Sequence, residues 1–167
     1  KVRLRQYARG VDAALRPVLS GSDLPLILAA NPPLGPIFRS VSSYPHLLED
    51  GFREEVDRLS DAELAARARP ILDAAYAAEV ERARALLAER ESEGRTTYDV
   101  ATAARAAVLG AIDTLLVDMD TTVPGSLDET TGEVAFADAP GAASYGVVDQ
   151  LAVRALGTGA RVLSSGQ

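Results

Sequence analysis

The segment from Thr97 to Asp120 constrains the fold of this chain more than any other part of the sequence. Apolar residues recur at the spacing of one helix face from residue 100 to residue 108. Gly110 then suits the left-handed backbone conformation that ends a helix. Residues 112–119 are apolar enough for a strand that is covered on both faces. The segment therefore predicts a helix, a glycine stop and a buried strand.

The N-terminal part predicts a helix, a short strand and a long connection. Apolar residues share one helix face over residues 2–19, and residues 24–30 form an apolar run that Asn31-Pro-Pro ends. Residues 34–40 predict one or two helical turns, and a weak extended segment follows at residues 41–43. Residues 44–59 are predicted to be a loop that holds any seam between two lobes.

Ser60-Asp-Ala-Glu63 has the pattern of a capping box, in which the serine hydroxyl accepts from the Glu63 amide and the glutamate reaches back. A long helix is expected after it, with an end at residues 91–94. Pro70 lies inside this pattern, removes one amide and clashes with the preceding turn. We therefore expect a kink or a break between Arg67 and Pro70.

The C-terminal part predicts a hairpin, a helix and a final strand. Residues 122–127 and 133–137 flank a turn-forming segment. Ser144 can cap a last helix that Gly157 closes, and a strand is expected at residues 161–164. This order of elements predicts an α/β fold with a mixed sheet and helices on both faces, a three-layer α/β/α arrangement.

Composition excludes several kinds of site. The chain has 167 residues and no cysteine, which excludes disulfides and thiolate metal sites and fits a cytoplasmic protein. His46 is the only histidine, which excludes a zinc site with several histidines. Any Ser-His-Asp triad would have to use His46 as its base. No apolar run approaches the roughly 20 residues that span a membrane. The chain begins with lysine rather than methionine, which is compatible with its being part of a longer protein.

Charge is distributed unevenly. Residues 96–167 hold three cations and nine acids, which account for −6 of the chain's net charge of −7. An acidic surface repels phosphates, so direct RNA binding by the C-terminal half is not expected. The first twenty residues instead hold five cations and a single acid, Asp12. Arg5, Arg9 and Arg16 on the first helix are the candidates for an RNA contact, and a solvated helix face is the simpler alternative.

One alternative function is enzymatic. Leu115-Leu-Val-Asp-Met-Asp-Thr-Thr122 resembles the first motif of the haloacid dehalogenase-like phosphatases. That resemblance implies a Mg²⁺-dependent phosphohydrolase with Asp118 as nucleophile and Asp120 as general acid/base. The family also needs a downstream lysine or arginine and a later acidic pair, but the only lysine here is Lys1, only Arg154 and Arg161 follow the motif, and Asp138 and Asp149 are isolated. We therefore expect no catalytic residues, no metal and no cofactor, and treat the two aspartates as polar residues that end a buried strand.

The other resemblance covers most of the chain. Ala106-Ala-Val-Leu-Gly-Ala-Ile-Asp-Thr-Leu-Leu-Val-Asp118 is similar to the third domain of archaeal and eukaryotic class-1 peptide-chain release factors and of Pelota. Residues 26–30 resemble a strand near the end of their central domain, and residues 155–165 resemble their last helix-to-strand passage. Tyr44-Pro-His-Leu47 and Ser60-Asp-Ala-Glu-Leu64 are similar to segments of bacterial relatives.

This second resemblance implies a division of the chain and a role in protein docking. Residues 1–57 would be the end of a central domain, and residues 58–167 a third domain with the fold of kink-turn-binding ribosomal proteins. In the family that domain docks to translational GTPases and recycling factors near the ribosome. The implied function is therefore non-catalytic docking in termination, rescue or recycling. Tyr44 and His46 join the three arginines as candidate interaction residues.

Two features limit what the resemblance implies. The chain has no Gly-Gly-Gln loop for peptide release, and Gly94-Arg-Thr-Thr-Tyr98 lacks the asparagine and lysine of kink-turn binders. A structural or interaction domain unrelated to translation is the remaining alternative.

Overall fold

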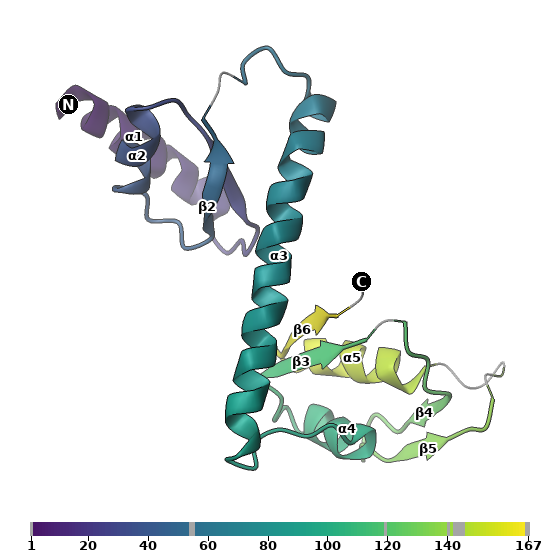
Figure 1. Cartoon of the computed structure of the whole chain (residues 1–167). Helices are drawn as coiled ribbons and strands as arrows, with labels where there is room; N and C mark the ends of the chain where they lie inside the picture. The colour runs from purple at the N-terminus through teal and green to yellow at the C-terminus, as the bar shows by residue number, and fades with distance from the viewer. Residues whose placement is uncertain (1, 54–55, 119, 140, 142–145, 166–167) are drawn as a thin grey trace. The chain divides into compact units, whose positions relative to one another are not determined.

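The computed structural model describes residues 2–53, 56–118, 120–139, 141 and 146–165, and has a mixed α/β fold, as predicted (Figure 1). The chain forms two compact units, residues 1–77 and 78–167, which divide within the long helix α3, Asp61–Glu91. The predicted boundary between residues 57 and 58 remains a prediction. No helix in the described part of the chain is long and apolar enough to cross a membrane.

The first unit is built on a parallel pair of strands. β1, Leu26–Ala29, lies beside β2, Leu47–Phe52. Helix α1, Val2–Leu19, has the bounds that the sequence predicted, and it packs against the short helix α2, Leu34–Arg39. Ala8 on α1 and Phe38 on α2 are buried.

The prediction of a continuous loop over residues 44–59 was wrong because β2 lies within it. Glu49, Asp50 and Gly51 interrupt the apolar pattern of this strand, so its sequence does not resemble a buried strand. The backbone nevertheless pairs with β1, and a Cβ at Gly51 would collide with the Leu28 carbonyl oxygen. Close approach of the two strands therefore explains the glycine.

Helix α3 begins with the predicted capping box. The Ser60 hydroxyl accepts from the Glu63 amide at 3.4 Å, and Glu63 Oε2 accepts from the Ser60 amide at 2.9 Å. Of the predicted kink or break between Arg67 and Pro70, the break is wrong, since the helix continues through the proline to Glu91, and the kink remains a prediction. Pro70 is exposed and removes only one amide donor from a helix of 31 residues. The ion pair between Arg69 and Asp73, at 2.8 Å, joins the residues on either side of the proline.

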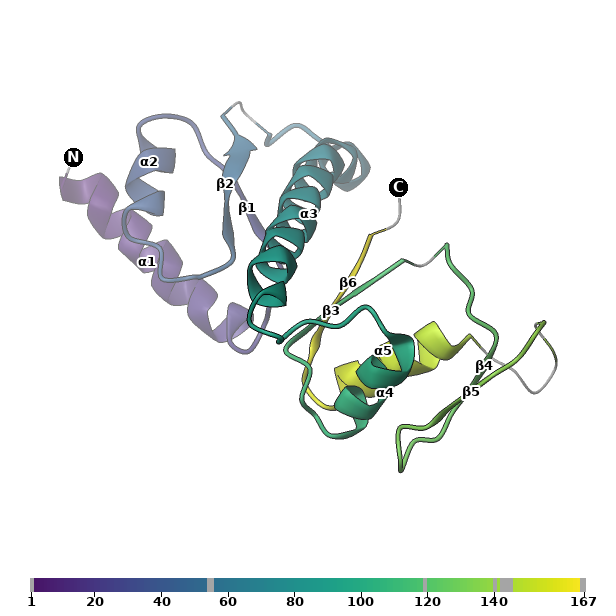
Figure 2. The ribbon, with the colours of Figure 1, turned by 60° about the horizontal axis from the view of Figure 1, so that its bottom comes forward.

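The second unit has helices on both faces of a parallel strand pair, β3, Thr114–Val117, and β6, Arg161–Ser164 (Figure 2). Leu115 and Val162 contact the core formed with α4, Val100–Val108, and α5, Val147–Gly157. Leu116 and Leu163 instead pack against Val80 and Ala83 of α3. The alternation of side chains along each strand thus covers both faces.

The ends of α4 agree with the local sequence signals. Asp99 caps its N-terminus and accepts from the Thr102 amide at 2.7 Å. Gly110 has a φ of 66° after the helix, which confirms the predicted glycine stop. The predicted cap of α5, Ser144, lies outside the described residues, and Gly146 precedes that helix.

The predicted hairpin is confirmed as the antiparallel pair β4, Gly125–Leu127, and β5, Val134–Phe136. Gly132 in its turn has a φ of 74°, and a Cβ there would lie 2.7 Å from the Arg105 Cα. The described strands form three two-stranded sheets rather than one mixed sheet. β4 contacts α5 directly, so the hairpin packs against this helix and does not extend the β3–β6 pair.

Candidate interaction site

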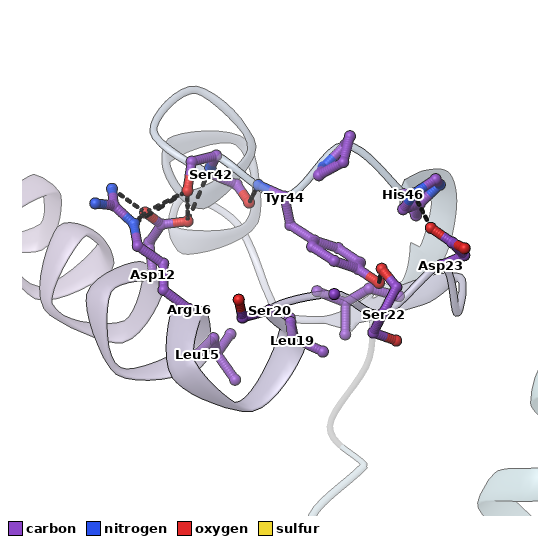
Figure 3. Close-up of a pocket in the computed structure, with 14 residues that line it drawn as sticks. Asp12, Leu15, Arg16, Leu19, Ser20, Ser22, Asp23, Ser42, Tyr44 and His46 are labelled. Carbon is purple, nitrogen blue, oxygen red and sulfur yellow. Dashed lines mark hydrogen bonds and ion pairs between the residues drawn. The ribbon is translucent and has the colours of Figure 1, made fainter.

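The first unit contains a hollow of about 430 Å³ beside the C-terminal half of α1 (Figure 3). Its walls come from α1, from the segment that follows the helix, and from the segment that precedes β2. Arg16, Tyr44 and His46, three of the five predicted interaction residues, line it. The sequence places these residues far apart, and the fold brings them to one surface.

A buried carboxylate organises one side of the hollow. Asp12 is 4% exposed, and its Oδ1 accepts from the Ser43 amide at 2.8 Å. Its Oδ2 accepts from Arg16 Nη2 at 2.8 Å and from Nε at 3.2 Å. The Ser43 amide, followed by the Arg16 guanidinium, lowers the pKa of Asp12 below its ordinary value of 3.8. Asp12 is therefore held ionised, and it ties α1 to the segment before Tyr44.

Asp12 and Ser43 were not among the predicted site residues. The signal for Asp12 was present, because it is the only acid among the cations of the first helix and lies four positions before Arg16. Nothing in the sequence pointed to Ser43, because its contact with Asp12 bridges 31 positions of the chain.

Tyr44 occupies the middle of the hollow and closes it against the chain that follows α1 (Figure 3). Its hydroxyl donates to the Leu24 carbonyl oxygen at 2.6 Å and lies 3.2 Å from that of Ser22. Its ring meets the His46 ring edge to face, with 5.5 Å between the centroids. Tyr44 is therefore both a lining residue and a structural tie.

His46 lines the hollow on the side opposite Asp12 and Arg16 (Figure 3). Its Nε2 lies 3.6 Å from Asp23 Oδ1, and this contact is an ion pair only when the imidazole is protonated. The Asp23 side chain is 99% exposed, so solvent screens the pair and its contribution to stability is small. The His46 side chain remains 42% exposed and is available to a partner.

The structure separates Arg5 and Arg9 from this hollow. Both side chains are exposed on α1, and neither lines the hollow. Within the described part of the chain, neither forms a hydrogen bond or an ion pair, whereas the charge of Arg16 is partly balanced by Asp12. The uncompensated positive charge of the predicted stripe therefore lies at Arg5 and Arg9.

Asp118 and Asp120 lie in the other unit, directly after β3. Asp118 Oδ1 accepts from the Asp120 amide at 3.0 Å, and its Oδ2 accepts from the Thr121 hydroxyl at 2.8 Å. These two bonds, that of Thr121 first, lower the pKa of the Asp118 carboxyl. The carboxylate is thus committed to a turn. Among the described residues, no group of three or more His, Cys, Asp or Glu side chains is placed to hold a metal ion.

Residues 1–78 match the family model described as bacterial archaeo-eukaryotic release factor family 11. This match confirms the predicted release-factor-like resemblance for these 78 residues, which are less than half of the chain, and supports a role related to translation. It contains every residue of the hollow, together with Arg5 and Arg9. The chain matches no curated protein. The resemblance of residues 106–118 to a third domain lies beyond the matched range and remains a prediction.

Proposed function

We propose that this release-factor-like chain is a non-catalytic docking module that binds the ribosome or a translation factor in the cytoplasm. The partner is the ribosome itself, a translational GTPase or a recycling factor. The contact surface consists of the hollow lined by Arg16, Tyr44 and His46 and the exposed cations Arg5 and Arg9 on the same helix as Arg16.

The convergence of these residues within the family-matched range is the observation that carries the proposal. The side chains that anchor a protein interface fill pockets on the partner surface. The hollow supplies apolar wall from Leu15 and Leu26 and exposed polar groups from Arg16 and His46. The bonds of Asp12 and Tyr44 fix its shape before any partner arrives, which lowers the entropy lost on binding.

The distribution of charge supports an orientation for this contact. All ten acids of residues 1–77 are balanced by ten cations, so the net charge of −7 is carried by residues 78–167. Ribosomal RNA repels the acidic unit, whereas Arg5 and Arg9 attract phosphate. We therefore place the ribosome-facing surface on α1 and its surroundings.

Sedimentation of the chain with ribosomes through a sucrose gradient tests this proposal. The wild-type chain is expected to migrate with ribosomes at low salt, and the double substitution Arg5→Glu/Arg9→Glu is expected to abolish that migration. Arg53→Glu/Arg58→Glu is the matched control, because it changes the charge of the same unit equally at exposed positions outside α1. The proposal is wrong if the wild-type chain stays at the top of the gradient both with purified ribosomes and with ribosomes carrying translational GTPase or recycling factors.

A further inference from the structure

A second surface, in the other compact unit, is distinguished by the absence of cations. Between Arg105 and Arg154 the sequence contains no lysine or arginine and has eight carboxylates. Four of these belong to the β4–β5 hairpin and its flank, and all four are exposed: Asp128, Glu129, Glu133 and Asp138. The hairpin therefore projects a purely negative charge.

The backbone of β5 is unpaired along one edge. The Asp128 amide donates to the Glu133 carbonyl at 2.9 Å, and the Ala137 amide donates to the Pro124 carbonyl at 3.0 Å. Hydrogen-bonded residues alternate along an antiparallel pair, so Ala135 also faces β4. The backbone groups of Val134 and Phe136 consequently point away from β4, toward an edge where the described residues place no strand.

This edge also exposes an aromatic side chain. Phe136 is 59% exposed, whereas Val134 packs against the core of the unit. Natural edge strands are protected by short length, charged residues, proline or a bulge. β5 is short and is flanked by Glu133 and Asp138, but it contains no lysine, proline or bulge, so its edge stays open to a segment of opposite charge. An extended segment that added here would pair with the open backbone groups and cover Phe136.

We propose that the outer edge of β5 binds an extended, basic segment of a partner protein, which adds to the hairpin as a third strand. Glu133 and Asp138 lie at the two ends of the strand and select cationic side chains. They also exclude a second copy of this chain, since two such edges would bring like charges together. This site is independent of the hollow in the first unit.

The test measures the binding of a short, labelled peptide of alternating arginine and valine to residues 1–167 by fluorescence anisotropy. Two comparison peptides separate charge from backbone pairing. One replaces arginine by glutamate, and the other is N-methylated at alternate residues so that its backbone cannot pair. Only the unmodified basic peptide is expected to bind, with the other two weaker by roughly tenfold or more.

Charge-reversal variants locate the site. Glu133→Lys/Asp138→Lys is expected to lower the affinity for the basic peptide by about tenfold, whereas Glu89→Lys/Glu91→Lys on α3 should change this affinity by less than about twofold. Both variants add the same charge at exposed positions of the same unit. Phe136→Ala is a second test that leaves the charge unchanged, and it should also lower the affinity because an added strand would cover Phe136. Equal binding of the N-methylated peptide, or an equal loss in both charge variants, would overturn the proposal.

Discussion

The Ser43 amide donates a 2.8 Å hydrogen bond to Asp12 Oδ1 although the two residues are 31 positions apart in the chain. Arg16 bonds the same carboxylate from one helical turn away. Asp12 therefore joins a local contact to a long-range one, and the shape of the hollow depends on its charge.

Asp12→Asn is expected to lower the melting temperature at pH 7, because the amide cannot form the same ion pair with Arg16. The folded-state pKa of Asp12 is lowered, so its stabilising contribution is present above the ordinary value of 3.8 and is lost as the pH falls through the folded-state value. Melting curves of both proteins from pH 7 to acid should therefore converge below that value. A difference that stays constant across this range would contradict the assignment.

Tyr44→Phe removes the hydroxyl that donates to the Leu24 carbonyl oxygen while keeping the ring beside His46. We expect a loss of about 1 kcal/mol in the free energy of unfolding, as measured by urea denaturation. Tyr7→Phe is the matched control, because the Tyr7 side chain is 60% exposed and its hydroxyl forms no hydrogen bond with the described residues, so its removal should change stability by less than about 0.5 kcal/mol. A neutral Tyr44→Phe would show that this tie is not needed.

Pro70→Ala is expected to stabilise α3. The proline removes one amide donor and crowds the preceding turn inside a continuous helix, at a cost of about 3 kcal/mol. Proline also restricts the unfolded chain, so part of this gain is offset and a net increase of roughly 1–2 kcal/mol is expected. Differential scanning calorimetry measures the change. A lower melting temperature would mean that the proline is required by the helix.

Gly125→Ala should destabilise the hairpin by roughly 2 kcal/mol or more. Gly125 has a φ of 153°, and a Cβ there would collide with the Ala135 carbonyl oxygen and lie 2.8 Å from Val147 Cγ2. Gly157→Ala is the matched control, because a Cβ at Gly157 has open space around it and alanine favours the helix that ends there. The melting temperature should therefore fall clearly in Gly125→Ala and should stay the same or rise in Gly157→Ala.

Asp118→Asn tests the enzymatic alternative. If the carboxylate only holds a turn, the wild-type chain with Mg²⁺ and p-nitrophenyl phosphate should release phosphate at the background rate, and the variant should do the same. Weaker acceptance from the Asp120 amide and the Thr121 hydroxyl should lower the melting temperature of the variant slightly. Phosphate release that depends on Asp118 would make the chain an enzyme.

Elements whose signals are local could be predicted from the sequence. The capping box of Ser60 and Glu63 and the stop at Gly110 each depend on a few neighbouring residues, and both are present. β2 was missed because Glu49 and Asp50 carry no apolar pattern and the strand is stabilised by pairing with distant β1. The break predicted at Pro70 was wrong because the turns on both sides keep the helix continuous although one amide donor is missing.

The candidate site could be predicted only in part, for a related reason. Tyr44 and His46 came from a resemblance and Arg16 from the pattern of charge, so each was found separately. That they surround one hollow depends on the contact between Asp12 and Ser43 and on the bond between Tyr44 and Leu24. Such contacts join distant parts of the chain, and no local pattern encodes them.

The contact between Gly132 and Arg105 has a consequence for how this chain can change during evolution. Any side chain at Gly132 would meet the α4 backbone at Arg105 and would also adopt an unfavourable φ, so two independent penalties act on one position. A scan of all substitutions should therefore find Gly132 intolerant of change, although it lies outside the hollow of the first unit. Substitutions should be tolerated at Glu129, on the exposed side of the same turn. The hairpin can thus diversify in charge among relatives only while this glycine is kept.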